Sequence, residues 1–97
     1  MTGTVSPRIQ REIRTFARQS GAEQVILFGS RARGTNGMRS DIDLAVRGGN
    51  ADLFAELMSD KLHSLLKADV VKLTAELSED LQREIERDGI VLYEKSR

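Results

Sequence analysis

The sequence predicts a mixed α/β fold, in which a sheet of about four strands is flanked by helices. Segments with apolar residues at every third or fourth position alternate with short, β-branched apolar runs that are typical of strands. The predicted order is helix, strand, short helix, strand, helix, strand, helix, strand. A chain of 97 residues builds one hydrophobic core, so we expect a single domain over residues 1–97.

The first helix is expected to begin at Pro7, with the Ser6 hydroxyl as its cap, and to end near Gly21. Its apolar face is formed by Ile9, Ile13, Phe16 and Ala17. Four arginines lie mostly off this face: Arg8, Arg11, Arg14 and Arg18. They form either a solvated basic side of the helix or a docking surface for a nucleotide, RNA or an acidic partner.

Two strands are expected on either side of a central segment. Residues 25–28 form a short apolar run, as in a strand buried on both faces, and Gly29 ends it. Residues 30–34 are expected to form a short helix and residues 35–40 a loop. From residue 41 to residue 46 polar and apolar side chains alternate. We therefore expect one face of this strand to lie in the core and the other to carry Asp41 and Asp43.

The second half of the chain is expected to contain two helices and two strands. Asn50 follows two glycines and caps a helix with a broad apolar stripe. This stripe consists of Leu53, Phe54, Leu57, Met58, Leu62, Leu65 and Leu66. Residues 68–73 form the third strand. Ser78 caps the last helix, which buries Leu81 and Ile85 and which Gly89 is expected to end in the left-handed conformation, before a strand at residues 90–93.

The composition excludes several classes of function. Fifteen basic and fifteen acidic residues give a formal net charge of zero, which disfavours direct binding of nucleic acid through long-range attraction. The absence of cysteine excludes disulfides, thiolate chemistry and cysteine-ligated zinc. No apolar run approaches about twenty residues and no signal peptide precedes the first helix, so we expect a cytoplasmic protein without a membrane span.

The two aspartates of the second strand point to metal chemistry. Residues at i and i+2 of a strand project from one face with Cα atoms roughly 6.5 to 7 Å apart, so both carboxylates can grip one metal ion or a close pair. Oxygen ligands of this kind suit Mg²⁺, and two ions can stabilise the attacking and leaving oxygens of a phosphoryl transfer. Asp69, at the start of the third strand, is the best candidate for a third carboxylate beside Asp41 and Asp43.

The turn after the first strand has the features of a phosphate-binding site. Gly29 and Ser30 precede a short helical segment, where free backbone N–H groups and a hydroxyl can hold phosphate. Other candidates for nucleotide binding are Arg31, Arg33, Arg39 and Ser40, although each arginine can equally pair with a surface carboxylate. Each half of the site alone fits an acidic strand edge beside an ordinary turn. Their joint occurrence favours phosphoryl chemistry.

The segment GSRARGTNGMRSDIDL combines Gly-Ser, ten residues and Asp-x-Asp. It resembles the signature of the DNA polymerase β-like nucleotidyltransferase superfamily, in particular its minimal nucleotidyltransferases. The resemblance covers nearly the whole chain, because those proteins are about this size and end in a helix and a strand similar to LQREIERDGIVLYE. Asp69 in ADVVKL matches the place of the third carboxylate of that family.

This resemblance implies an Mg²⁺-dependent enzyme that transfers a nucleotidyl group from a nucleoside triphosphate to a hydroxyl and releases pyrophosphate. Gly29 and Ser30 would hold the triphosphate, Asp41 and Asp43 would ligate the metals, and Asp69 would ligate metal and help to activate the acceptor hydroxyl. Many minimal members resemble antitoxins paired with a helical HEPN-type ribonuclease toxin, and some silence it by adenylylation of a tyrosine. ATP is then the expected donor.

Three functions therefore stay open on the sequence. The first is adenylyl transfer to a partner protein, expected to be a cognate HEPN-type toxin. The second is an antitoxin or assembly module that acts by contact alone, and the third is transfer to RNA or a small molecule. Larger relatives carry substrate-binding domains after the catalytic one, so we expect another chain, or a second copy in a homo-oligomer or hetero-oligomer, to hold the acceptor.

Overall fold

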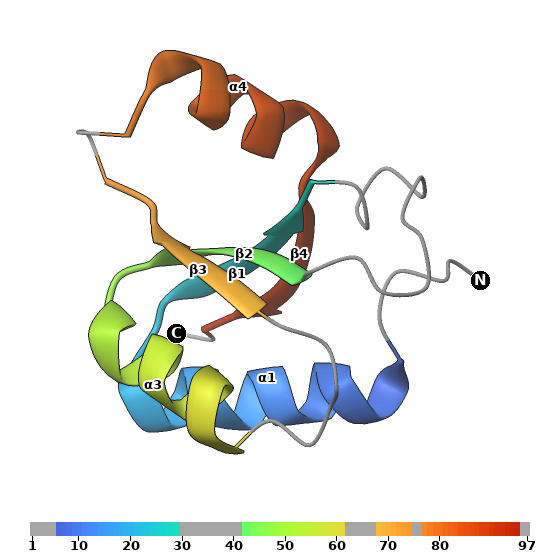
Figure 1. Ribbon diagram of the computed structural model, residues 1–97, viewed down its shortest axis with the longest axis vertical. Helices are drawn as coiled ribbons and strands as arrows, with labels where there is room; N and C mark the ends of the chain where they lie inside the picture. The colour runs from blue at the N-terminus through green and yellow to red at the C-terminus, as the bar shows by residue number, and fades with distance from the viewer. Residues whose placement is uncertain (1–5, 30–41, 62–67, 75–76, 96–97) are drawn as a thin grey trace.

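The computed structural model describes residues 6–29, 42–61, 68–74 and 77–95. The described elements, in chain order, are α1 (Pro7–Ser20), β1 (Gln24–Phe28), β2 (Ile42–Arg47), α3 (Ala51–Lys61), β3 (Ala68–Lys72), α4 (Glu79–Asp88) and β4 (Ile90–Glu94). The mixed α/β class expected from the sequence is confirmed, and Figure 1 shows its arrangement. The short helix at residues 30–34, the loop at 35–40 and the apolar positions at 62–66 lie outside the described residues.

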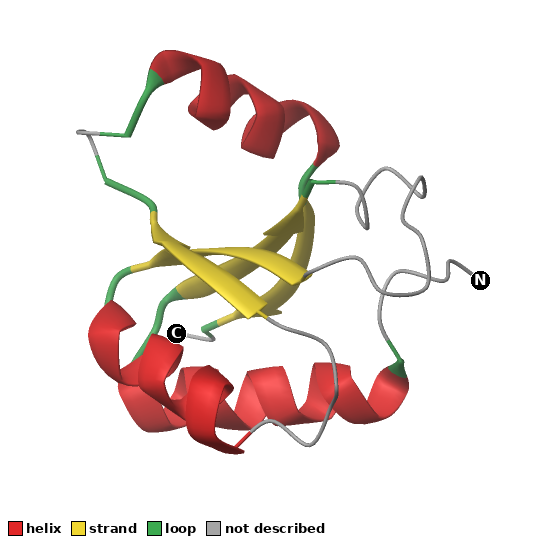
Figure 2. Cartoon of the chain, in the orientation of Figure 1, coloured by secondary structure: helices red, strands yellow, loops and turns green. Residues whose placement is uncertain are grey.

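Within the described part of the chain, four strands form one sheet with the order β3-β2-β1-β4. The central strand β1 is antiparallel to both β2 and β4, whereas β2 and β3 run parallel (Figure 2). The parallel pair is possible because α3 carries the chain back to the other end of the sheet between β2 and β3. As a result, the starts of β2 and β3 lie side by side.

The larger core lies between the sheet and the two helices α1 and α3, which cover the same face in Figure 1. Helix α1 supplies the four apolar residues expected from its periodicity, and α3 supplies Phe54 and Met58. From β2, the alternating residues Ile42, Leu44 and Val46 enter this core, as predicted. Because successive residues of a strand point to opposite faces, Asp43 belongs to the opposite face of the sheet.

That opposite face is packed by α4, which Figure 1 shows on the other side of the sheet from α1 and α3. A second cluster consists of Ile26, Phe28, Ala45 and Ile85, and Ala45 is 0% exposed. Both faces of β1 are buried, as expected. The expectation that only one face of β2 is core needs correction, because α4 covers the Ala45 end of the face on which Asp43 lies.

Local capping interactions set the helix starts where the sequence places them. The Ser6 hydroxyl accepts a hydrogen bond from the Ile9 N–H at 3.3 Å, and Asn50 Oδ1 accepts one from the Leu53 N–H at 3.0 Å. Gly21 ends α1 in the left-handed region, with a φ of 73°. Each of these contacts satisfies backbone groups that the first or last turn of a helix leaves unpaired.

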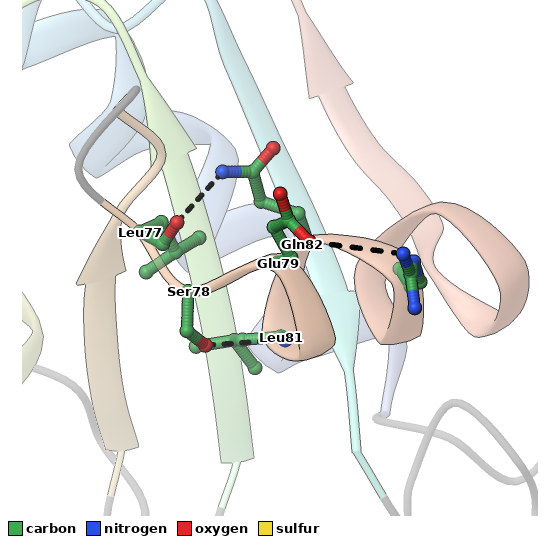
Figure 3. A network of polar contacts seen from close by, with 6 residues as sticks. Leu77, Ser78, Glu79, Leu81 and Gln82 are labelled. Carbon is green, nitrogen blue, oxygen red and sulfur yellow. Dashed lines mark hydrogen bonds and ion pairs between the residues drawn. The ribbon is translucent and has the colours of Figure 1, made fainter.

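Helix α4 starts as predicted but ends differently. Figure 3 shows the Ser78 hydroxyl accepting from the Leu81 N–H at 3.3 Å, while Gln82 Nε2 donates to the Leu77 carbonyl at 2.8 Å. The expected left-handed conformation of Gly89 is wrong, since its φ is −67° and its ψ is 144°. The reason is that β4 begins at the next residue, so the chain leaves the helix in an extended conformation.

Candidate active site

Two of the predicted carboxylates belong to partner residues of the parallel pair of strands. Asp43 of β2 and Asp69 of β3 are register partners, and Asp43 is also the partner of Phe28 in the antiparallel pair with β1. Partners in register share a face of the sheet, and neighbouring strands lie about 4.8 Å apart. The two aspartates are therefore adjacent on the face that α4 partly covers. Asp43 is half-buried there, and Asp69 is exposed.

Gly29 lies beside Asp43 at the end of β1. It directly follows β1 and has a φ of 80°, in the left-handed region that favours glycine. A Cβ atom placed on Gly29 would overlap Asp43 Oδ2 and would lie 3.2 Å from Asp43 Cγ. The Asp43 carboxylate thus packs directly against the backbone of the turn at which the sequence predicts phosphate binding.

The structure therefore brings together three predicted site residues: Gly29, Asp43 and Asp69. The other predicted residues lie outside the described part of the chain: Ser30, Arg31, Arg33, Arg39, Ser40 and Asp41. Among the residues that the structure describes, no cluster of three or more histidine, cysteine, aspartate or glutamate side chains could hold a metal ion. The three-carboxylate arrangement expected from the sequence needs Asp41, so it stays a prediction.

The chemistry of the two paired aspartates suits a cation. Like charges directly opposite one another on neighbouring strands destabilise a sheet by roughly 0.2 to 1 kcal/mol. A divalent cation offsets this repulsion, and carboxylate oxygens are the ligands that Mg²⁺ prefers. The donor set of Asp43 and Asp69 fits such an ion, and the turn at Gly29 leaves space for the Asp43 carboxylate beside it.

A separate cavity of about 470 Å³ lies between α4 and the sheet. It is lined by Ile26, Arg47, Leu73, Thr74, Gln82, Ile85, Glu86, Gly89 and Val91. Neither aspartate of the site contributes to this lining, and Val91 at its edge is 50% exposed. The sequence gives no sign of this cavity, because its lining comes from several elements whose packing is not local.

One arginine of the first helix has a structural role that the sequence does not reveal. Arg14 Nε donates a hydrogen bond to the Leu92 carbonyl at 3.0 Å. The register between β1 and β4 shifts at Leu92, which has no partner residue on β1. At such an irregularity the extra residue of a strand is left out of the regular hydrogen-bond ladder. The side chain of Arg14 is nevertheless exposed, as are those of Arg11 and Arg18, so the choice between a solvated basic side and a docking surface on α1 stays a prediction.

The end of α4 carries an ion pair. Arg87 donates to Asp88 Oδ2 from Nε at 3.2 Å and from Nη2 at 3.0 Å. This hydrogen bond and the charge of Asp88 raise the pKa of the Arg87 guanidinium above its usual value. The pair stabilises the last turn of α4 only weakly, because Arg87 is exposed.

Within the described ranges, every helix is too short or too polar to cross a lipid bilayer.

Comparison with curated proteins gives no match. Among solved structures, one chain of a toxin-antitoxin crystallised with AMP-PNP has a TM-score of 0.71 and 24% identity, over 90% of this chain and 74% of that chain. A chain of a mutant of the toxin-antitoxin MntA-HpeT has a TM-score of 0.70 and 22% identity, over 90% and 74% of the two chains.

At these identities the two structures establish a common fold and no more. The family comparison is more specific, because residues 10–97 match the family described as "Polymerase beta, Nucleotidyltransferase". The Gly-Ser turn, the Asp-x-Asp motif and Asp69 all lie within this range. It covers nearly the whole chain and confirms the resemblance inferred from the motif. The chain belongs to the polymerase β nucleotidyltransferase family.

Proposed function

We propose that this protein transfers AMP from ATP to a hydroxyl group of a partner protein in an Mg²⁺-dependent reaction. The observation that supports the proposal most strongly is the pairing in register of Asp43 with Asp69, with the Asp43 carboxylate packed against Gly29.

The residues divide into a metal-binding group and a phosphate-binding group. Asp41, Asp43 and Asp69 would hold two Mg²⁺ ions, which neutralise charge on the reacting phosphate when bound. The exposed position of Asp69 leaves it accessible to an incoming hydroxyl, whose proton it can help to remove. Backbone N–H groups at Gly29 and Ser30 would bind the triphosphate. Arg31, Arg33 and Ser40 would add contacts to the nucleotide.

The donor and the partner are inferred from the structural relatives. A toxin-antitoxin of the same fold was crystallised with AMP-PNP, an analogue of ATP, which supports an adenine nucleotide as the donor. Both structural relatives reported above are toxin-antitoxin complexes. We therefore propose that the acceptor is a HEPN-type helical toxin. The proposed location is the cytoplasm, where ATP is abundant.

Incubation with radiolabelled ATP, Mg²⁺ and the protein encoded by the neighbouring reading frame tests this proposal. We expect label on the partner with the wild-type chain, and a loss of about a hundredfold or more with Asp43→Asn or Asp69→Asn, because each removes a charged metal ligand. Asp60→Asn, on the exposed side of α3, is the matched control and should retain activity. Absence of label on any protein with the wild-type chain would count against adenylyl transfer to a protein.

A second function, neutralisation of the partner by contact alone, is supported by the exposed arginines of α1. It predicts that a chain with Asp41→Asn and Asp43→Asn still protects cells from the toxin, whereas Arg11→Glu with Arg18→Glu does not. Catalytic silencing predicts the reverse for the aspartate variant. Adding RNA and aminoglycosides as separate acceptors in the labelling reaction tests the third function, transfer to RNA or a small molecule.

A further inference from the structure

We propose that Gly29 is a positioning residue for Asp43, in addition to any contact that it makes with phosphate. The missing side chain of Gly29 leaves the space that the Asp43 carboxylate occupies, and the backbone of the turn then fixes the direction of this carboxylate. The part of this inference that concerns Mg²⁺ rests on the proposed function. The contact itself does not.

The contact involves the whole carboxyl end of Asp43. A Cβ atom on Gly29 would overlap Oδ2, would lie 3.2 Å from Cγ and would lie 3.4 Å from Cβ of Asp43. The Asp43 backbone cannot shift away easily, because β2 is an inner strand whose residue 43 is in register with Phe28 on one side and Asp69 on the other. A side chain on residue 29 would therefore force the carboxylate to rotate.

The direction of the carboxylate matters because of its neighbours. Gly29 continues β1, whereas Asp69 is on β3, at the opposite side of β2. Packing of Oδ2 against Gly29 therefore holds the charge of Asp43 on the β1 side, away from the charge of Asp69. A carboxylate displaced by a side chain at residue 29 would turn toward Asp69, toward the apolar cluster under α4 or toward solvent, and in each case it would leave the direction that the Gly29 contact sets.

Gly29 combines this contact with a positive φ, and the chain offers a control that separates the two. Gly21 has a φ of 73°, close to the 80° of Gly29, but a Cβ atom on Gly21 would meet nothing within 4 Å. Substitution of alanine for Gly21 thus introduces only the strain of a left-handed backbone. The same substitution of Gly29 introduces that strain and the overlap with Asp43.

A double-mutant cycle on the folding equilibrium tests the contact without any assay of activity. Gly29→Ala should lower the equilibrium constant for folding severalfold more than Gly21→Ala, because the Asp43 carboxylate must move to admit the new methyl group. In the background of Asp43→Ala this extra loss should disappear, because the overlapping atoms are gone. An equal loss for Gly29→Ala and Gly21→Ala, or an extra loss that persists with Asp43→Ala, would overturn the proposal.

A metal titration then separates positioning of Asp43 from phosphate binding. We expect Gly29→Ala to raise the Mg²⁺ concentration for half-maximal labelling about tenfold or more, with a smaller change in the KM for ATP at saturating Mg²⁺. Gly21→Ala should leave both unchanged. Mg²⁺-induced thermal stabilisation of the chain without ATP, which does not depend on activity, should weaken in the same way. A rise in the KM for ATP alone, with an unchanged Mg²⁺ dependence, would contradict the positioning role.

The experiments distinguish failure of the proposed function from failure of the positioning role of Gly29. If the wild-type chain labels no acceptor but the folding cycle shows coupling and the Mg²⁺-induced stabilisation weakens in Gly29→Ala, the proposed function fails and the positioning role stands. If the wild-type chain labels its partner but Gly29→Ala shows no coupling with Asp43→Ala, the proposed function stands and the positioning role is refuted.

Discussion

Replacement of Asp69 by asparagine should stabilise the protein in the absence of Mg²⁺ while it removes activity. Asp69 and Asp43 are register partners on strands about 4.8 Å apart, and the Asp43 carboxylate is held on the β1 side of its strand, so we place the two charges roughly 6 Å apart. Because Asp69 is exposed, the medium between them is close to water, and two unit charges at this distance repel by roughly 0.7 kcal/mol. Screening at 0.1 M salt reduces this to about 0.4 kcal/mol.

The expected gain for Asp69→Asn is therefore a rise in Tm of about 2 to 3 °C for a chain of this size. Thermal or urea unfolding with EDTA present measures it, and Glu86→Gln, at an exposed residue of α4, controls for the change in net charge. The gain should nearly vanish at about 1 M salt, where the screening length falls to roughly 3 Å.

Added Mg²⁺ should make the wild-type chain more stable than Asp69→Asn, which is the reverse of the order expected with EDTA. The wild-type chain gains free energy of unfolding in proportion to the logarithm of Mg²⁺ concentration above its Kd, whereas Asp69→Asn gains less because it has lost a ligand. A loss of stability in Asp69→Asn with EDTA, or an equal gain from Mg²⁺ in both chains, would refute the assignment of these two aspartates to one cation site.

Three further predictions concern the support of the site. Ile85→Ala should lower the free energy of unfolding by about 2 to 5 kcal/mol in urea titrations, because this residue, 3% exposed, anchors α4 on the sheet; a loss below about 1 kcal/mol would contradict that anchor. Arg14→Met should cost about 1 kcal/mol through the loss of its bond to the Leu92 carbonyl, whereas Arg11→Met should be neutral; equal effects would argue against it. Asn50→Ala should cost about 1 kcal/mol through loss of the α3 cap, and an unchanged urea midpoint would show that the cap is dispensable.

The parts of the fold that could be predicted from sequence depend on local physical rules. Alternation along residues 41–46 places Ile42, Leu44 and Val46 in the core, and the caps at Ser6, Asn50 and Ser78 set the helix starts. A side chain at a cap binds backbone two or three residues away, so its effect is visible in a short stretch of sequence. The motif and its spacing likewise single out Gly29 and Asp43 as candidate site residues, and the position of Asp69 at the start of a short apolar strand makes it a third candidate.

The parts that could not be predicted depend on contacts between distant segments. The packing of α4 over Ala45 requires knowledge of which face of the sheet each helix covers, and the bond from Arg14 to Leu92 joins residues 78 positions apart. The conformation of Gly89 depends on the strand that follows it rather than on the helix that it ends. The register of Asp43 with Asp69 and its contact with Gly29 arise only when three strands pair.

The position of the label on ATP gives the most direct test of nucleotidyl transfer at this aspartate pair. Transfer of AMP keeps the α-phosphate on the acceptor and releases the other two phosphates. The wild-type chain with Mg²⁺ should therefore label its partner from α-labelled ATP and not from γ-labelled ATP, and the partner should gain the mass of AMP. Asp43→Asn should abolish both signals. Label from γ-labelled ATP, or undiminished labelling by Asp43→Asn, would contradict the account.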